Sequence, residues 1–263
     1  MTNSYKSILA LLCAAAVSAC GDNAVQTITQ PLPGASIKFH NFAVGAPSVN
    51  FYAGTTKLTA ISSTSGVEST TGTTYPAAGA NGVGNAGLYS GIAPGTYTFT
   101  GNIAATTDNG LAVSSATGTL ADGKFYSYFQ GGVYDPVAKK ADAFIVEDPF
   151  IANFDYTQAY VRIVNASANA APMILYAKNT TTLVEVPLGA ATAYKAAGAF
   201  TALPQGIYDI SARATGSSTN TFLRTAVTIL AGRVYTVTAL GDATLSTTGT
   251  AATRAVLNVT ANR

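Results

Sequence analysis

The stretches Ile37-Lys38-Phe39-His40-Asn41 and Val161-Arg162-Ile163-Val164-Asn165 decide the fold, because each opens one copy of a duplicated unit. The two stretches lie 124 positions apart. In each, the first and third residues are apolar and the second is a cation, and this period of two is typical of a half-buried β-strand. We therefore expect one face of each opening strand to lie in a core and the cation to lie on the other face.

Further matched segments follow in the same order in both copies, so the duplication covers nearly all of the chain after residue 35. They are 49–52 with 173–176, 94–99 with 205–210, 120–126 with 230–235, and 143–146 with 255–258. Each unit has about 110 residues in short alternating runs separated by turn residues. Gly95, Gly206, Gly123 and Gly232 stand where turns lead into strands.

About seven strands per unit predict an immunoglobulin-like β-sandwich, because a sheet with one apolar face must bury that face against a second layer. The sequence thus predicts an all-β protein with two such sandwiches in tandem. The expected boundaries are a cleaved signal peptide at 1–19, a lipidated cysteine and tether at 20–34, repeats at 35–148 and 158–263, and a linker at 149–157. The linker is aromatic, so we expect it to pack between the repeats.

The first copy is longer than the second. Ile37 and Gly95 are 58 positions apart, whereas Val161 and Gly206 are 45 apart, so the first copy carries 13 extra residues. The segment from Ser62 to Ser90, rich in Ser, Thr, Gly and Ala, is the natural place for them. A long loop on a sandwich edge can bind a ligand or can serve as a spacer. The sequence leaves both alternatives open.

The N-terminus predicts export. An uncharged run of ten residues from Ile8 to Val17 is too short for a bilayer core, which needs about 20 apolar residues, but it suits a signal peptide. The next residues, Ser18-Ala19-Cys20, resemble the end of a bacterial lipoprotein signal, which would be cut before Cys20 and would place a lipid on its thiol. An ordinary secretory peptide is the alternative.

The cysteine count favours lipidation, because Cys13 leaves with the signal peptide and the mature chain then has one cysteine and no internal disulfide. We expect a protein anchored to the membrane of the cell envelope by acyl chains such as palmitate. Gly21 in place of aspartate favours the outer membrane, by analogy with enterobacterial sorting. The sequence does not choose between the periplasmic face and the surface face.

Composition narrows the possible partners. Charged residues make up 10% of the chain, against roughly 25% in typical domains. The net charge is +2, or +1 once Lys6 has left with the signal peptide, so we expect no nucleic-acid partner. The polar surface must come from Thr, Ser, Asn and Gly, which suits contacts to a protein or a glycan.

At the matched segments the sequence resembles a bacterial family known as domain of unknown function 4397. The closest stretches are 161–167 and 231–237, and the first copy keeps Ala46-Pro47-Ser48-Val49-Asn50-Phe51-Tyr52. The resemblance implies an exported or surface-anchored scaffold without a shared activity. The family's frequent His falls here on Asn41 and Asn165. Its acidic positions fall on neutral residues: Gly45, Asn169, Asn50 and Ile174.

No catalytic or cofactor constellation stands out, and we expect no cofactor and no metal. His40 is the one histidine and corresponds to Val164, so we expect a structural role for it. One His and one lipidated Cys cannot supply a zinc site. Carboxylates gather near the linker at Asp142, Glu147, Asp148 and Asp155, without the spacing of a calcium loop.

Tyrosines form two groups. Those at 75, 89 and 134 are expected in exposed loops, where they could stack on sugars or pack at an edge. Those that recur in both copies are expected to be core or corner residues: Tyr52, Tyr176, Tyr97, Tyr208, Tyr126 and Tyr235.

The sequence favours a non-enzymatic, membrane-anchored envelope lipoprotein that has a binding or structural role through its sandwich loops, with a protein or a glycan as partner. The alternative hypothesis is an envelope hydrolase that uses the carboxylates near the linker, with Asp142, Glu147 and Asp148 as its candidates.

Overall fold

The computed structural model describes residues 34–58, 72–75 and 89–262. The expected signal peptide, Cys20, the tether up to residue 33 and most of the 62–90 segment lie outside the described residues. Within the described part there are sixteen strands and no helix, which confirms the all-β prediction. No helix there could cross a membrane.

Eight strands build each repeat, one more than the sequence led us to expect. Some are too short to show alternation; β3 has two residues. The strands of the first repeat are β1 (Ala35–Asn41), β2 (Val49–Ala53), β3 (Thr56–Lys57), β4 (Ser90–Ile92), β5 (Gly95–Ile103), β6 (Ala112–Leu120), β7 (Phe125–Asp135) and β8 (Lys140–Glu147). Those of the second are β9 (Gln158–Asn165), β10 (Met173–Asn179), β11 (Glu185–Thr192), β12 (Thr201–Pro204), β13 (Gly206–Ala214), β14 (Phe222–Ile229), β15 (Val234–Leu240) and β16 (Val256–Ala261).

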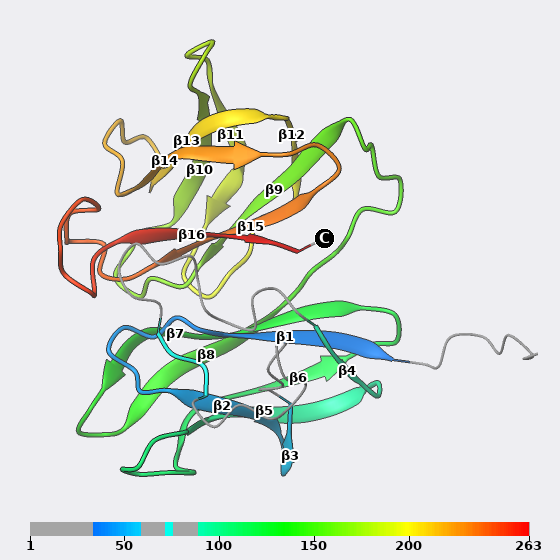
Figure 1. Ribbon diagram of the computed structural model, residues 1–263, viewed down its shortest axis with the longest axis vertical. Helices are drawn as coiled ribbons and strands as arrows, with labels where there is room; N and C mark the ends of the chain where they lie inside the picture. The colour runs from blue at the N-terminus through cyan, green and yellow to red at the C-terminus, as the bar shows by residue number, and fades with distance from the viewer. Residues whose placement is uncertain (1–33, 59–71, 76–88, 263) are drawn as a thin grey trace, which may run out of the picture. The chain divides into compact units, whose positions relative to one another are not determined.

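The two repeats have the same sheet topology (Figure 1). In the first, the sheets run β4-β1-β7-β8 and β3-β2-β5-β6; in the second, they run β12-β9-β15-β16 and β11-β10-β13-β14. The pairs β1–β7 and β9–β15 are parallel, and the other pairs are antiparallel. The duplication and the two-layer immunoglobulin-like sandwiches expected from the sequence are therefore present.

Each sandwich encloses its own core, built by the alternation seen in the sequence. Ile37 and Phe39 of β1 are fully buried in the first core, and Val161 and Ile163 of β9 are buried in the second. Aromatic rings fill much of the first core; those of Phe39 and Phe51 stack with centroids 5.1 Å apart. Burying such side chains stabilises each sandwich by roughly 1.5–3 kcal/mol per residue.

Four recurring tyrosines are corner residues, as expected. The hydroxyls of Tyr97 and Tyr208 donate to the carbonyl oxygens four residues earlier, each at 2.9 Å. Those of Tyr126 and Tyr235 accept from the amides of Ala121 and Leu230, at 3.1 and 3.2 Å. Each hydroxyl thereby holds the turn before its strand at a fixed distance from the sheet.

The expectation of a core or corner role is wrong for the remaining pair. Tyr52 and Tyr176 are half-buried and alternate with the core residues of β2 and β10, so they lie on the outer sheet faces. The guanidinium of Arg213 lies 3.6 Å from the centroid of the Tyr176 ring and shields one face of it. The apolar neighbours on both sides of each tyrosine face the core, so the tyrosine between them faces outward, as strand alternation requires.

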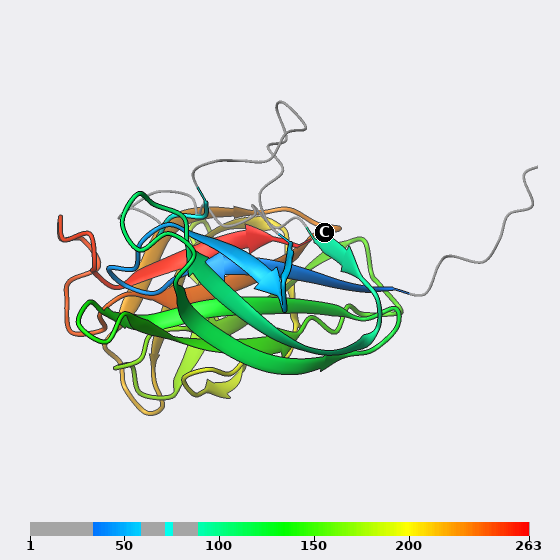
Figure 2. The same ribbon diagram turned by 90° about the horizontal axis from the view of Figure 1, so that it is seen from below.

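A third apolar cluster joins the repeats within the compact unit Gly34–Arg263. It combines Phe42, Phe129 and Phe144 of the first repeat with Val164, Ala166 and Leu240 of the second. The sheet that contains β1, β7 and β8 faces the sheet that contains β9, β15 and β16 (Figures 1 and 2).

The linker packs between the repeats, as its aromatic content predicted. The ring of Phe150 lies 5.0 Å from that of Phe125 in the first repeat and 6.2 Å from that of Phe200 in the second.

Candidate functional site: a buried polar network between the repeats

Two cations lie in the interface between the repeats. Lys38 projects from β1 and Arg162 from β9, each on the face opposite its core, and each side chain is 1% exposed. Lysine and arginine are almost never fully buried unless they are paired. Their partners therefore determine what this interface can do.

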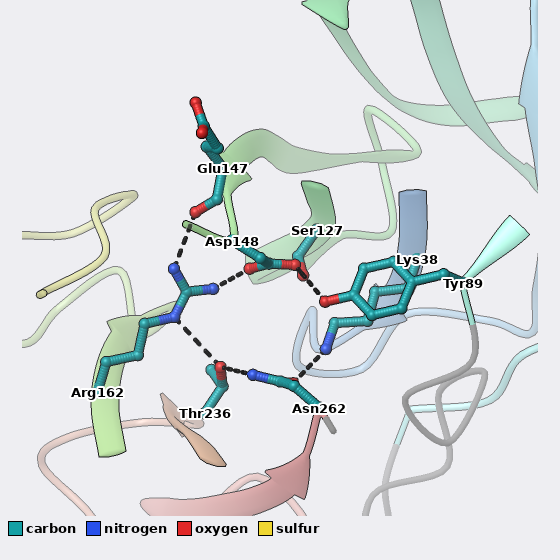
Figure 3. Close-up of polar contacts among 8 residues, drawn as sticks. All are labelled: Lys38, Tyr89, Ser127, Glu147, Asp148, Arg162, Thr236 and Asn262. Atoms are coloured by element: carbon teal, nitrogen blue, oxygen red, sulfur yellow. Dashed lines mark hydrogen bonds and ion pairs between the residues drawn. The ribbon is translucent and has the colours of Figure 1, made fainter. Parts of the chain in front are cut away.

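Arg162 is bonded through each part of its guanidinium (Figure 3). Nη2 forms a buried ion pair with Oδ1 of Asp148, Nη1 donates to the carbonyl oxygen of Glu147 at 2.8 Å, and Nε donates to Oγ1 of Thr236 at 3.2 Å. The guanidinium also lies 4.5 Å from the centroid of the Phe200 ring. These contacts tie β9 of the second repeat to the end of β8 in the first.

Asp148 is bonded through both carboxylate oxygens. Oδ1 is paired with Arg162, and Oδ2 accepts from the hydroxyls of Ser127 and Tyr89, each at 2.7 Å. Burial raises the pKa of Tyr89 far above 10, and the charge of Asp148 and its hydrogen bond raise it further. The Tyr89 hydroxyl therefore stays protonated and serves as a donor.

Lys38 has an amide as its hydrogen-bond partner. Its ammonium donates to Oδ1 of Asn262 and lies 4.8 Å from the centroid of the Tyr89 ring (Figure 3). Nδ2 of Asn262 in turn donates to Oγ1 of Thr236 at 2.7 Å. Burial lowers the pKa of Lys38 to about 8; Asp148 opposes this shift and Arg162 adds to it.

The network has approximate two-fold symmetry. Lys38 and Arg162 occupy the same place on β1 and β9, and Ser127 and Thr236 occupy the same place on β7 and β15. Two further residues, Asp148 and Asn262, each follow the last strand of a repeat. Each cation thus binds the residue that follows the last strand of the other repeat, and a reciprocal arrangement of this kind is typical of an isologous interface.

His40 lies beside this network as a neutral ring stacked with two aromatic rings. It is 4% exposed and stacks with Phe42 and Phe129, with ring centroids 5.0 and 4.7 Å away. Burial lowers its pKa well below 6.5, and the neighbouring charge of Lys38 lowers it further, so the ring is neutral at pH 7. Its counterpart Val164 belongs to the same apolar cluster.

The asparagines at the family's histidine position are buried, and their side-chain amides bind nearby groups of the chain. The side-chain amide of Asn41 donates to the carbonyl oxygens of Pro47 and Thr73, each at 3.0 Å, and its Oδ1 accepts from Gln130 at 2.9 Å. In the second repeat, Oδ1 of Asn165 accepts from the amide of Ser167 at 3.1 Å. Both side chains hold the chain where it leaves the first strand.

The carboxylates proposed for hydrolysis are separately engaged. Asp142 is half-exposed, pairs with Lys195 at 3.2 Å and accepts from Tyr194 at 2.8 Å. Glu147 is also half-exposed and pairs with Lys124 at 3.1 Å. In residues 34–58, 72–75 and 89–262, no three His, Cys, Asp or Glu side chains gather as metal ligands would.

The three loop tyrosines are not exposed, which corrects the sequence expectation. Tyr134 lies in β7 and packs against the first core. Tyr89 belongs to the network, and Tyr75 packs against the cluster that joins the repeats. Each ring has a neighbour in the fold that its local sequence does not reveal.

A surface pocket of about 280 Å³ borders the network on the side of the first repeat. Its lining includes Phe125, Phe150 and the ion-paired Lys124 and Glu147. Asp148 contributes to its wall, but its oxygens point to the partners described above. The network therefore joins the two repeats, and the charge of Asp148 is already neutralised by Arg162.

Among known proteins, the chain is similar to one family over its second repeat. No curated protein matches the sequence. The solved structures that match include the Bacillus anthracis TIE protein, at 11% identity over 78% of this chain and 33% of that structure, with a TM-score of 0.22. The chain therefore spans about a third of that structure's length. The family resemblance seen in the sequence is confirmed for the second repeat, because residues 159–261 match the family described as domain of unknown function (DUF4397).

Proposed function

We propose that the chain is a non-enzymatic lipoprotein of the bacterial cell envelope, anchored through Cys20, that binds a protein or glycan partner through its sandwich loops. The observation that carries the proposal is the state of the ionisable groups between the repeats. Lys38, Asp148 and Arg162 are each 1% exposed, and each is bonded to a residue of the opposite repeat. Ionisable groups that are buried and bonded in this way favour the interpretation that the two repeats form a rigid scaffold.

The carboxylates also favour binding over hydrolysis. A glycosidase needs a pair of carboxylic groups roughly 5–10 Å apart on either side of the scissile bond. Here Asp148 is buried in an ion pair, while Asp142 and Glu147 each pair with a different lysine. The hydrolase alternative would need these ion pairs to open before substrate could bind.

The evidence for the proposed membrane anchor comes from the sequence. Cys20 ends a motif typical of lipoprotein signals and is the one cysteine of the mature chain. Two or more acyl chains are needed for stable membrane attachment. The proposed location is the outer membrane, with residues 20–34 as the lipidated cysteine and tether expected from the sequence.

Labelling with an alkyne analogue of palmitate tests the anchor. The wild-type chain should take up the label and fractionate with membranes, and Cys20→Ala should lose both properties. Cys13→Ala is the matched control, because this cysteine lies in the segment expected to be removed, and it should behave as the wild type. Equal labelling of Cys20→Ala and the wild type would refute the lipid anchor.

Crosslinking in cells, followed by mass spectrometry, tests the binding role. One dominant envelope protein would identify a protein partner, and crosslinks to its residues would locate the surface. If no protein is captured, binding of isolated envelope glycans to the purified chain should be measured. If neither binds, the proposed role is wrong. For the hydrolase, the combined substitution of Asp142, Glu147 and Asp148 would have to abolish the cellular phenotype.

A further inference from the structure

The first repeat carries a sheet face made of uncharged polar side chains. The sheet β3-β2-β5-β6 is the layer of this repeat that does not face the second repeat (Figure 1). Because side chains alternate along a strand, every second residue of β2, β5 and β6 points away from the core. These residues, which we call the threonine face, are Asn50, Tyr52, Thr96, Thr98, Thr100, Asn102, Ser115, Thr117 and Thr119. Lys57 of β3, which pairs with Tyr52, stands at its edge.

Hydroxyl pairs cross this face between β5 and β6. The Oγ1 atoms of Thr96 and Thr119 are 2.8 Å apart, and those of Thr98 and Thr117 are 2.9 Å apart; all four residues are exposed. One hydroxyl of each pair donates to the other, so each pair keeps one donor and further lone pairs for a ligand. Outward residues repeat about every 7 Å along a strand and lie about 5 Å apart across two strands. The threonine face is therefore a regular grid of donors and acceptors.

Two acceptors without donors lie on the same face. Asn50 of β2 and Asn102 of β5 stand directly opposite each other. The Oδ1 atom of each is buried and has no hydrogen-bond partner among the described residues. Buried acceptors in folded proteins are rarely left unpaired, and an unpaired one indicates a place where a water molecule or a ligand completes the bonding. These two amides therefore point to a hydroxylated ligand independently of the threonine pairs.

The second repeat shows that the sandwich does not require these side chains. At the positions that Thr96, Thr98, Thr100 and Asn102 occupy in β5, the strand β13 has Ile207, Asp209, Ser211 and Arg213. There the guanidinium of Arg213 pairs with Glu185 and covers the ring of Tyr176. Asn102 is too short to cover the ring of Tyr52 in that way. The same fold thus has a charged face in one repeat and a neutral, hydroxyl-rich face in the other.

We propose that the threonine face binds a neutral polysaccharide, with sugar hydroxyls bonded to the threonine pairs and one sugar ring against Tyr52. The proposal rests on the binding role proposed above and deepens it, because it names the class of partner and places the site on a sheet face. An ionic ligand would find no opposite charge on β2, β5 or β6, whereas a sugar hydroxyl both donates and accepts. A polymer would engage several of these weak, repeated contacts at once.

The composition of the face also favours a glycan over a protein partner. Serine and threonine are under-represented among the residues that carry the binding energy of protein interfaces, where tryptophan, tyrosine and arginine dominate. Tyr52 is the one residue of the threonine face that belongs to the second group. The face has the hydrogen-bonding capacity that a sugar needs and little of the apolar anchoring that a protein interface needs.

The test is a titration of the full chain, labelled with ¹⁵N, in which the backbone amide signals are followed. The probes are cellohexaose and chitohexaose as neutral hexamers, a galacturonate hexamer as an anionic one, and glucose as a single sugar. Amide signals of β5 and β6 should shift with at least one neutral hexamer, and much less with glucose or the anionic hexamer. Thr98→Val combined with Thr117→Val removes both hydroxyls of one pair, keeps the β-branched shape, and should weaken binding about tenfold.

Thr228→Val is the matched control, because Thr228 is an exposed threonine on β14 in the corresponding sheet of the second repeat. This variant should bind the neutral hexamers as the wild type does. Thermal midpoints measured without sugar identify an unfolded variant, and Thr98→Val alone then replaces the double substitution, with an expected loss of about threefold.

The possible failures separate this proposal from the wider binding role. Shifts confined to other surfaces, or equal affinity in the wild type and the double variant, would overturn the threonine face and leave glycan binding in place. Shifts with the anionic hexamer alone would overturn a neutral ligand. If no sugar moves any signal, the proposal is wrong, and the crosslinking experiment in cells then decides whether a protein partner sustains the binding role.

Discussion

Lys38 and Arg162 occupy equivalent positions in the two repeats, and each donates to the residue that follows the last strand of the other repeat. The acceptor is Asn262 for Lys38 and Asp148 for Arg162. A reciprocal exchange of this kind is what a symmetric dimer would make between its subunits. Here both repeats belong to one chain, so the two acceptor residues need not be identical, and one is an acid while the other is an amide.

Removal of Arg162 should destabilise the protein strongly. Arg162→Met would leave the Asp148 carboxylate buried without its cation, and breaking a buried pair in this way costs about 3–5 kcal/mol. Urea unfolding of the full chain, with the free energy of unfolding extrapolated to water, checks this value. Lys195→Met, which breaks the half-exposed pair with Asp142, is the matched control and should cost less than about 1 kcal/mol. Equal losses in the two variants would contradict the account.

Lys38 should make stability increase with pH in the alkaline range. Its pKa is about 8 in the folded chain and about 10.5 in the unfolded chain, so between these values the unfolded state binds more protons. The free energy of unfolding should therefore increase by roughly 1–2 kcal/mol from pH 7.5 to pH 9.5. Lys38→Met should lack this increase. If the free energies of unfolding of the wild type and Lys38→Met changed with pH in parallel, the Lys38 ammonium would not be buried as described.

His40 should make stability fall in acid. Its pKa lies well below 6.5 in the folded chain, so below pH 6.5 the unfolded state takes up a proton that the folded state refuses. The loss should amount to at most about 1.4 kcal/mol per pH unit. His40→Phe keeps a flat ring between Phe42 and Phe129 and should abolish this part of the pH dependence. The difference between the two proteins, measured by urea unfolding at pH 5 and pH 7, isolates the histidine from the carboxylates; no difference would contradict the assignment.

Much of the fold could be predicted from the sequence because it depends on local pattern. The alternation of apolar and charged residues at 37–39 and 161–163 predicted which face of each opening strand enters a core. The repeated order of segments predicted two sandwiches. The turns before β7 and β15 were predicted from Gly123 and Gly232, whose backbone adopts φ values of 67° and 73°, a region that favours glycine.

The candidate site could not be predicted in the same way, because alternation shows which residues leave the core and not what covers them. The sequence placed Lys38 and Arg162 on the outer face, but their partners Asn262 and Asp148 are 224 and 14 positions away. One signal was available: a long cation recurs at the same outward position of both copies, in a chain with few charges. That recurrence indicates that the outward faces of the two opening strands, β1 and β9, share a role.

The most direct measurement is to cut the linker and ask whether the repeats stay together. A specific protease site placed within residues 149–157 of the full chain allows cleavage after folding, and size-exclusion chromatography then reports the mass. We expect the two fragments to elute as one complex. Asp148→Arg puts a third cation beside Lys38 and Arg162 and should make the fragments separate. Fragments of the otherwise unchanged protein that elute apart after cleavage would show that the network does not join the repeats.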